Sequence, residues 1–377
     1  MRIRSVRLFS FRNLAEIRLD LDPGFNVLAG RNGQGKTNVL EGLYLLAMPR
    51  SFRAGRYEDW VSRDAERGAV QCVLETAHGE MELSLHLENG RRIYLLDNQR
   101  VRGVADLAVH LKIVFFGPED LKLIKGGPGE RRRFLDRALY RENPAHLGLV
   151  QDYHDLVKQR NALLKEYGRG RLPAGLLESY EEQLVRKGAE LTAGRVRIAA
   201  AIGEEVARYW EGVQSVSGGV VSLRYLSGYG VEVNEEMTAA GFLGAAEEAL
   251  ARVRAEDMAR AVTGAGPHLD DLELLFDGRS ARSQASQGQI RSLAAALRMG
   301  ELLLWKRQRG VAPILMMDDL SSELDREHYR VIMAGVQAHA GQVILTTTSP
   351  EYVLHDVEAA LFQVSEGRVE RHASVTT

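Results

Sequence analysis

Hydrophobic and polar residues alternate along much of the first 120 positions. The alternating stretches cover residues 17–21, 70–76 and 81–87. A period of two is typical of antiparallel strands that bury one face. Residues 25–29 and 113–116 are instead short continuous apolar runs, which predict fully buried strands. This part of the chain is therefore expected to consist mostly of β-strands.

The middle of the chain, from residue 128 to 210, has a helical pattern. A glycine-rich break at 168–173 separates a helix expected at 145–167 from a longer one at 174–210. The longer helix would extend about 56 Å if it were unbroken. Gly188, Gly194 and Gly203 within it argue against a straight helix. A strand near 220–226 and a further helix near 239–260 are expected to follow.

Strands and helices alternate from residue 272 onward. The expected elements are strands at 272–276, 314–317 and 343–346, and helices at 286–306 and 325–339. This alternation favours a parallel sheet.

The two ends of the chain share an α/β pattern, whereas the middle is mainly helical. We therefore predict an α/β fold in which one domain is split by an insertion. Residues 1–120 and 264–377 would form the first lobe, and 121–263 a mainly helical second lobe.

Composition restricts the classes of function. The 377 residues are 45% hydrophobic and 27% charged, which is ordinary for a globular protein. The 49 basic and 51 acidic residues leave a net charge of −2, which argues against a wholly basic nucleic-acid binder but allows a local basic face. The single cysteine, Cys72, excludes an internal disulfide and a Cys-x-x-Cys zinc site. Without a membrane-length apolar run or a recognisable signal peptide, we expect a cytoplasmic protein without a membrane partner.

A phosphate-binding loop is predicted directly after the strand at 25–29. The loop reads Gly30, Arg31, Asn32, Gly33, Gln34, Gly35, Lys36 and Thr37, which fits the Walker A pattern at every fixed position. Its glycines let backbone N–H groups surround an anion, and a helix begins at the same place. Lys36 is expected to reach the β- and γ-phosphates of ATP, and Thr37 to bind Mg²⁺. The alternative is a glycine-rich turn without function.

A second acidic site follows the strand at 314–317. Asp318 and Asp319 form an acidic pair at its carboxyl end, as in a Walker B motif. Asp318 is expected to hold Mg²⁺ and Asp319 to orient the attacking water. The alternative is a strand end that carries two solvated acids.

Ser286, Gly288 and Gln289 resemble the signature motif of ABC-type ATPases. They open the helix expected at 286–306, where a hydroxyl, backbone N–H groups and the helix dipole can meet an anion. The alternative is an ordinary capping box formed by Ser286 and Gln289. Residues 320–325 resemble a D-loop, and Thr347 or Thr348 would serve as the switch residue near the γ-phosphate.

These motifs follow one another in the order of an ABC-type ATPase. In that class the signature of one subunit completes the ATP site of the other. We therefore expect a head-to-tail homodimer with two ATP molecules between its subunits. ATP binding would close the dimer and hydrolysis would open it.

Further blocks of the sequence resemble the RecF family of bacterial DNA replication and repair proteins. The blocks are residues 8–13, 49–53, 116–121, 125–126, 131–136 and 266–271. Leu269 stands where the family usually has Arg. The resemblance implies an ABC-type ATPase head related to SMC heads, ATP-dependent dimerisation, weak DNA-dependent ATP hydrolysis and DNA binding. It also implies a role with RecR and RecO in loading RecA at single-strand gaps.

Two groups of basic residues are candidates for contact with DNA phosphates. The first contains Arg50, Arg53 and Arg56, and the second contains Lys122, Lys125, Arg131, Arg132 and Arg133. Such contacts would give sequence-independent, salt-sensitive affinity. The alternatives are a solvated surface, ion pairs with neighbouring acids and, for Arg53, contact with nucleotide.

Three other functions remain open on the sequence alone. A transporter ATPase subunit would need a membrane partner and leaves the helical insertion unexplained. A nuclease-linked ATPase would need a metal-rich nuclease segment, which we do not find. A clamp that binds ATP without hydrolysing it would keep the same motifs.

Overall fold

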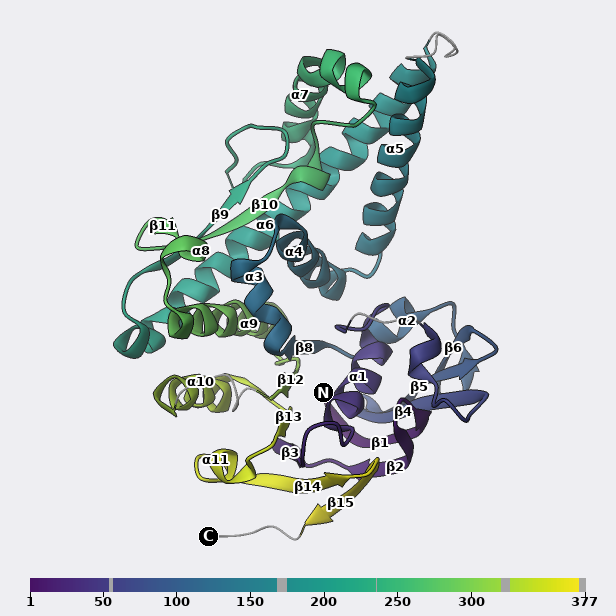
Figure 1. Cartoon of the computed structure of the whole chain (residues 1–377), viewed down its shortest axis with the longest axis vertical. Coiled ribbons are helices and arrows are strands. Elements are labelled where there is room, and N and C mark those ends of the chain that lie inside the picture. The colour runs from purple at the N-terminus through teal and green to yellow at the C-terminus, as the bar shows by residue number, and fades with distance from the viewer. Residues whose placement is uncertain (54–56, 168–174, 235, 320–325, 373–377) are drawn as a thin grey trace. The chain divides into compact units, whose positions relative to one another are not determined.

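The computed structural model describes residues 1–53, 57–167, 175–234, 236–319 and 326–372 (Figure 1). Its helices and strands fall into two compact units. The first contains residues 1–121, 208–218 and 286–377, and the second contains 122–207 and 219–285. The predicted lobes differ from these units chiefly at 264–285, which lie in the second unit rather than the first.

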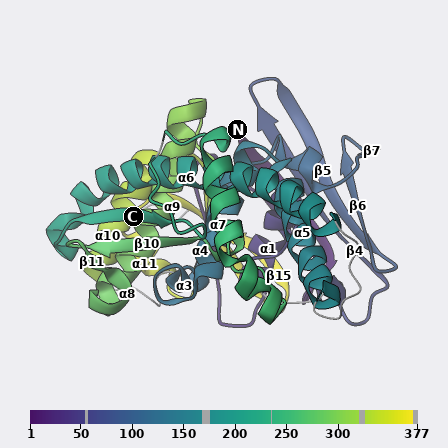
Figure 2. The same ribbon diagram turned by 90° about the horizontal axis from the view of Figure 1, so that it is seen from above.

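An antiparallel sheet forms one layer of the first unit. Its strand order is β2-β1-β4-β5-β6-β7, and β4, β5 and β6 run side by side in Figure 2. The strands are β1 (Arg2–Phe11), β2 (Leu14–Asp20), β4 (Arg67–Thr76), β5 (Gly79–Glu88), β6 (Arg91–Leu96) and β7 (Gln99–Arg100). The alternating burial of β1, β2 and β4 follows from the alternation of the sequence.

A second sheet in the same unit is parallel except at one edge. Its order is β15-β14-β3-β13-β12-β8, and only β15 runs antiparallel to its neighbour. The strands are β3 (Phe25–Ala29), β8 (Ile113–Phe116), β12 (Ile314–Asp318), β13 (Val343–Thr347), β14 (Ala359–Ser365) and β15 (Arg368–His372). Every residue of β8, β12 and β13 is buried, as their continuous apolar runs predict.

Helix α1 (Lys36–Ala47) contacts strands of both sheets. Most of its side chains are therefore buried, and Gly42 lies so close to β1 that an added Cβ would be 2.6 Å from Leu8 Cδ2. The other helices of this unit are α2 (Val104–Ala108), α9 (Gln287–Arg309), α10 (Arg326–His339) and α11 (Pro350–Leu354). The start of α1 is thus fixed by the core of the unit.

The second unit is mainly helical. Its helices are α3 (Leu121–Lys125), α4 (Pro128–Glu142), α5 (His146–Tyr167), α7 (Ala239–Arg260) and α8 (Ala281–Gln284), together with most of α6 (Leu176–Ser217). Side chains of α5, α6 and α7 share one hydrophobic cluster, and the three helices are seen from above in Figure 2.

Helix α6 is longer than the sequence predicts. It continues through all its glycines for 42 residues, or about 63 Å. One of these glycines has a packing role, because a Cβ added to Gly188 would lie 2.2 Å from Tyr229 Oη. Close packing against a neighbouring side chain here outweighs the weak helix propensity of glycine.

The predicted strand at 272–276 lies in a different sheet from the one expected. It forms β10 (Asp271–Phe276), which pairs antiparallel with β9 (Val221–Leu226) and with β11 (Arg279–Ser280) in a three-stranded sheet of the second unit. The prediction that it joins the parallel sheet is therefore wrong. Antiparallel pairing with β9 also explains the alternating burial of β10.

A buried ion-pair cluster joins α4, α6 and the segment before β10. The guanidinium of Arg195 donates to both carboxylate oxygens of Asp136, at 2.9 and 2.8 Å, and to Asp270 Oδ2 at 3.1 Å. Burial acts to raise the pKa of Asp136, but its charge attraction to Arg195 and the hydrogen bonds from His146 and Arg195 lower it to about 2. The cluster therefore holds Asp136 in its charged form.

Within the described residues, no helix is both long and apolar enough to cross a membrane.

Replacing Arg195 with Met should destabilise the second unit strongly. The change leaves the carboxylates of Asp136 and Asp270 buried without their cation, which typically costs about 3–5 kcal/mol. The matched control is Arg197→Met, because Arg197 lies on the same helix but is exposed and pairs with Glu142. The control should lose less than about 1 kcal/mol. Urea unfolding followed by circular dichroism measures both, and equal losses would contradict the assignment.

Candidate functional site

Three parallel strands end at one edge of the second sheet. Strand β13 lies between β12 and β3, with Asp318 opposite Thr346 and Ala29 opposite Thr347. Because parallel strands point the same way, their carboxyl ends and the segments that follow meet at this edge. The phosphate-loop sequence follows β3, and the acidic pair stands at the end of β12, so the two motifs are brought together here.

The phosphate loop has the backbone shape that its glycines permit. Gly33 and Gly35 have φ values of 80° and 114°, in the left-handed region that favours glycine. Gly35 directly precedes α1, and a Cβ there would lie 2.6 Å from Leu14 Cδ2. The N-terminus of α1 therefore begins at the loop and offers unpaired backbone N–H groups and a positive dipole to an anion.

The Lys36 side chain crosses the phosphate loop. Its Nζ donates to the carbonyl oxygens of Gly30 at 2.6 Å and Arg31 at 3.0 Å. Burial lowers the pKa of the Lys36 ammonium, while the carboxylates of Asp319 and Asp318 act in the opposite direction. A buried cation thus stands where the sequence predicts a phosphate ligand.

Asp318 accepts hydrogen bonds from two hydroxyl groups. Thr37 Oγ1 donates to Asp318 Oδ1 at 2.8 Å, and Thr346 Oγ1 donates to the same oxygen at 2.6 Å. Burial raises the pKa of Asp318, and the hydrogen bonds from Thr346 and Thr37 oppose this effect. Oxygen atoms from the start of α1 and from the ends of β12 and β13 therefore lie close together.

Asp319 lies beside them in an uncommon backbone conformation. Its φ of 43° lies in the left-handed region, and its N–H donates to Thr346 Oγ1 at 3.0 Å. Such a conformation persists only where its surroundings hold it. Here the hydroxyl of Thr346 is bonded to both members of the acidic pair.

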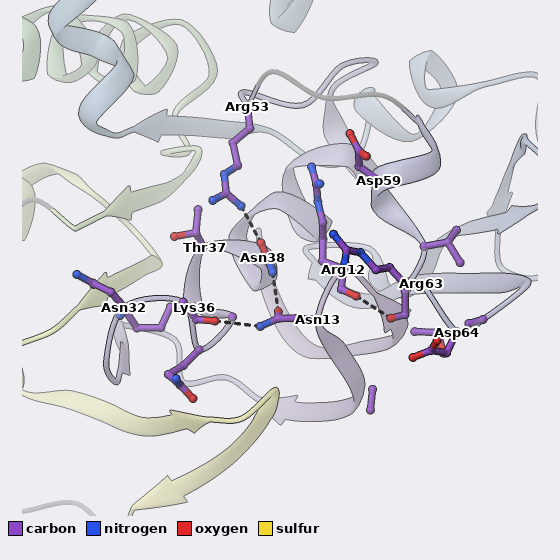
Figure 3. A pocket seen from close by; sticks show the side chains of 18 of the residues that line it. Arg12, Asn13, Asn32, Lys36, Thr37, Asn38, Arg53, Asp59, Arg63 and Asp64 are labelled. Carbon is purple, nitrogen blue, oxygen red and sulfur yellow. Dashed lines mark hydrogen bonds between the residues drawn. The ribbon is translucent and has the colours of Figure 1, made fainter.

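An open pocket of about 1180 Å³ lies over the phosphate loop (Figure 3). Its lining includes Asn32, Gly33, Gln34, Gly35, Lys36, Thr37, Asp319 and Thr346. Arg12, Asn13, Asn38, Arg53, Asp59, Arg63 and Asp64 extend it beyond the loop, as Figure 3 shows. The pocket is therefore polar, and it is lined by both basic and acidic side chains around the phosphate loop.

Arg53 belongs to this pocket. Its Nη1 donates to Asn38 Oδ1 at 2.7 Å and lies 3.6 Å from the buried carboxylate of Glu41, which Arg12 also binds at 2.7 Å. Arg53 therefore faces the phosphate loop, which favours the nucleotide alternative over contact with DNA. Arg31 is exposed, and its carbonyl rather than its side chain contacts Lys36.

The predicted signature residues form a capping box at the start of α9. Ser286 Oγ accepts the N–H of Gln289 at 3.2 Å, and Gln289 Oε1 accepts the N–H of Ser286 at 2.8 Å. Gln289 Nε2 also donates to the Ser217 carbonyl at 3.0 Å. Ser286 is exposed and does not line the pocket of its own chain. The capping alternative is thus observed, and a role of Ser286 in a partner's site stays a prediction.

The predicted switch residues, Thr347 and Thr348, do not line the pocket of their own chain. Thr346, not Thr347 or Thr348, lines the pocket and binds Asp318. Thr347 is buried and accepts the N–H of Ser349 at 3.0 Å, whereas Thr348 is exposed. Alternation along β13 directs Thr346 and Thr347 to opposite faces of the sheet, and Thr348 follows the end of the strand. The predicted D-loop at 320–325 lies outside the described residues.

The candidate DNA ligands differ widely in exposure. Arg131 is buried, pairs with Asp271 at 2.7 Å and donates to the Gly126 carbonyl at 2.8 Å. Arg131 is therefore a structural residue, and its assignment to DNA is wrong. Arg132 is half-buried and donates to the Asp270 carbonyl at 2.7 Å. Burial lowers its pKa.

The remaining basic candidates are on the surface. Arg50 is exposed in the first unit, and Lys122, Lys125 and Arg133 lie at least partly exposed in the second. Arg133 pairs with Glu130 on its own helix. Arg56 lies outside the described residues. In the described part of the chain there is no group of three or more His, Cys, Asp or Glu side chains suited to a metal ion.

Comparisons with known proteins give matches over nearly the whole chain. Residues 2–370 match the family model described as the RecF/RecN/SMC N-terminal domain. The chain is 35% identical to the DNA replication and repair protein RecF of Geobacter sulfurreducens, over 98% of this chain and 99% of that protein. It is 36% identical to RecF of Pelotomaculum thermopropionicum, over 98% of this chain and 100% of that protein.

Solved structures give the same result. The recombination mediator protein RecF-ATPrS of the RecFOR pathway has a TM-score of 0.88 and 27% identity, covering 99% of this chain and 98% of that one. An Smc head bound to the C-winged helix domain of ScpA has a TM-score of 0.57 and 16% identity, covering 100% and 98%, and shows the shared fold. The predicted α/β fold of an ABC-type ATPase head is confirmed, and the chain belongs to the RecF family within the RecF/RecN/SMC group.

Proposed function

We propose that the chain is an ATP-dependent DNA-binding protein of recombinational repair. It binds ATP with Mg²⁺, dimerises on ATP, hydrolyses it slowly in a DNA-dependent manner, and helps RecR and RecO to load RecA at single-strand gaps. The proposed binding of ATP rests chiefly on one observation: Thr37 and Thr346 both donate hydrogen bonds to Asp318 beside the phosphate loop. The repair part rests on the family and on the RecFOR pathway of its structural relative.

The oxygen atoms at this point fit a hard divalent cation. Thr37 Oγ1 and Asp318 Oδ1 lie 2.8 Å apart, and hydroxyl and carboxylate oxygens with water are the ligands that Mg²⁺ prefers. Thr37 and Asp318 would hold Mg²⁺, which when bound would neutralise charge on the β- and γ-phosphates. The hydroxyl of Thr346 would keep the Asp318 carboxylate directed at this position.

The other groups of the pocket have separate tasks in this proposal. Backbone N–H groups of the loop and the Lys36 ammonium bind the phosphate oxygens. Arg53 lies on the same pocket and adds a second cation near Asn38. Asp319 orients the attacking water from a backbone position that Thr346 fixes. ATP binding and hydrolysis by these groups require neither a nuclease site nor a membrane partner.

The separation of the phosphate loop from the predicted signature residues supports the proposed dimer. The phosphate loop and Asp319 line one pocket, whereas Ser286 is exposed and outside that pocket in the same unit. In the proposed dimer, the start of α9 from one subunit meets the γ-phosphate bound by the other. The capping box is compatible with this role, because it leaves helix N–H groups to meet an anion.

Thr346→Val should reduce ATP hydrolysis while keeping the fold. The change preserves shape but removes the hydroxyl that binds Asp318 and the N–H of Asp319. Loss of such positioning should lower kcat by about tenfold or more. Thr348→Val is the matched control, since Thr348 is exposed at the end of the same segment. Phosphate release with ATP and Mg²⁺ measures the effect, and equal rates in both variants would contradict the role of Thr346.

Ser286→Arg should block ATP-driven dimerisation but leave ATP binding by the monomer largely intact. A bulky cation would occupy the place offered to the partner's nucleotide. The substitution also removes a helix cap, which costs about 1 kcal/mol. Thr238→Arg serves as control because it removes the cap of α7 in the second unit. Sedimentation with ATP tests both variants, and a dimer formed by Ser286→Arg would argue against the shared site.

Reversing two surface charges of the second unit should weaken DNA binding. The double variant Lys125→Glu with Arg133→Glu removes two candidate phosphate ligands without touching the buried Arg131. The slope of log K against log salt should become shallower by about 1 for each phosphate ligand removed. Lys158→Glu with Arg186→Glu is the control, since it changes the net charge equally at exposed positions of α5 and α6. Identical salt slopes in the two double variants would remove this assignment.

A further inference from the structure

The phosphate loop is held by two segments that have no role in the proposed chemistry. One is the turn between β1 and β2, which contains Asn13. The other is the turn between β14 and β15, which contains Glu366 and Gly367. All of them belong to the first unit.

The turn between β14 and β15 binds Gln34 with two backbone N–H groups. The N–H of Glu366 donates to Gln34 Oε1 at 2.6 Å, and the N–H of Gly367 donates to the Gln34 carbonyl at 3.3 Å. Gln34 and Glu366 are 332 positions apart in the sequence. The side-chain oxygen of Gln34 therefore binds this turn, although the sequence places Gln34 only within a nucleotide-binding loop.

Asn13 holds the neighbouring residue of the loop. Its Nδ2 donates to the Gly33 carbonyl at 3.1 Å, and its Oδ1 accepts from Asn38 Nδ2 at 2.6 Å. Asn38 in turn accepts from Arg53 at 2.7 Å, and Figure 3 shows Asn13, Asn38 and Arg53 in this order. A chain of hydrogen bonds thus runs from the loop carbonyl to a cation of the pocket.

The two turns also touch each other. A Cβ added to Gly367 would lie 2.4 Å from the Asn13 carbonyl oxygen, so only glycine fits between them. Strand β14 comes equally close to the start of the loop, since a Cβ on Gly30 would lie 2.2 Å from the Val364 carbonyl oxygen. The loop is consequently held by backbone atoms of the β14–β15 hairpin and by the side chain of Asn13, which come from opposite ends of the sequence.

We infer that the β14–β15 turn and Asn13 are positioning elements that hold the phosphate loop in its anion-binding shape before ATP arrives. A loop already in its bound shape loses less conformational entropy on binding, so its affinity is higher. The turn acts through Gln34 and does not touch the phosphates itself. The expected effect of these elements on ATP affinity rests on the proposed function. Their expected effect on the conformation of the nucleotide-free loop does not.

The chain contains a matched control for the decisive substitution. Glu366 and Gly367 have φ values of 50° and 74°, and Asn89 and Gly90 in the β5–β6 turn have 49° and 72°. No atom lies within 4 Å of a Cβ added to Gly90. Replacing either glycine with Ala therefore creates the same backbone strain, but only Gly367→Ala also pushes against Asn13.

The experiment compares Gly367→Ala with Gly90→Ala in the full chain. Gly367→Ala should weaken ATP binding about tenfold, measured by titration calorimetry with Mg²⁺. It should also speed amide hydrogen exchange of residues 32–36 in the nucleotide-free protein, which Gly90→Ala should not. Equal ATP affinity and equal exchange at 32–36 in the two variants would overturn the inference.

Two further variants keep the inference testable if Gly367→Ala folds poorly. Asn13→Ala removes the side chain that holds Gly33 and should weaken ATP binding about three- to tenfold. Glu366→Asn keeps the backbone N–H and suits the left-handed conformation, so it should bind ATP as the natural chain does. Normal affinity in Asn13→Ala, or lost affinity in Glu366→Asn, would contradict the inference. If the natural chain bound no ATP but Gly367→Ala still showed faster exchange at residues 32–36, the proposed function would be refuted and the positioning role of the turn would stand.

Discussion

The hydrogen bonds that Asp318 accepts from Thr37 and Thr346 join the three motifs of the site. They are possible because β3, β13 and β12 are adjacent and parallel, so that the carboxyl ends of β12 and β13 and the loop that follows β3 lie at one edge of the sheet. Helix α1 is held between this sheet and the antiparallel one, which fixes the loop that precedes it. If the order of these strands were different, the same residues would lie too far apart to act together.

Much of the local structure could be predicted from periodicity and motif spacing. The buried strands β3 and β8 and the helix α7 have the expected bounds, because each is specified by residues close in sequence. The pairing of β10 with β9 could not be predicted in this way. A short alternating strand fits either sheet, and its partner is chosen by contacts between distant segments.

The candidate site shows the same division between local and distant information. The phosphate loop and Asp318 are identifiable from the sequence because their spacing carries the chemistry. The roles of Thr346 and of the β14–β15 turn depend on where strands end and which segments meet, which spacing does not reveal. Arg131 illustrates the opposite error. A basic residue within a basic stretch suggests an exposed position. Arg131 is instead buried, because it pairs with Asp271, which lies 140 positions away in the sequence.

In the proposed mechanism, ATP joins two copies of this chain through a shared site. The mass of the chain in solution, measured by sedimentation with ATP, with ADP and without nucleotide, tests this mechanism. We expect a dimer with ATP and Mg²⁺, monomers in the other two conditions, and monomers throughout for Lys36→Ala. A natural chain that binds ATP but stays monomeric, or a dimer that forms equally without nucleotide, would contradict it.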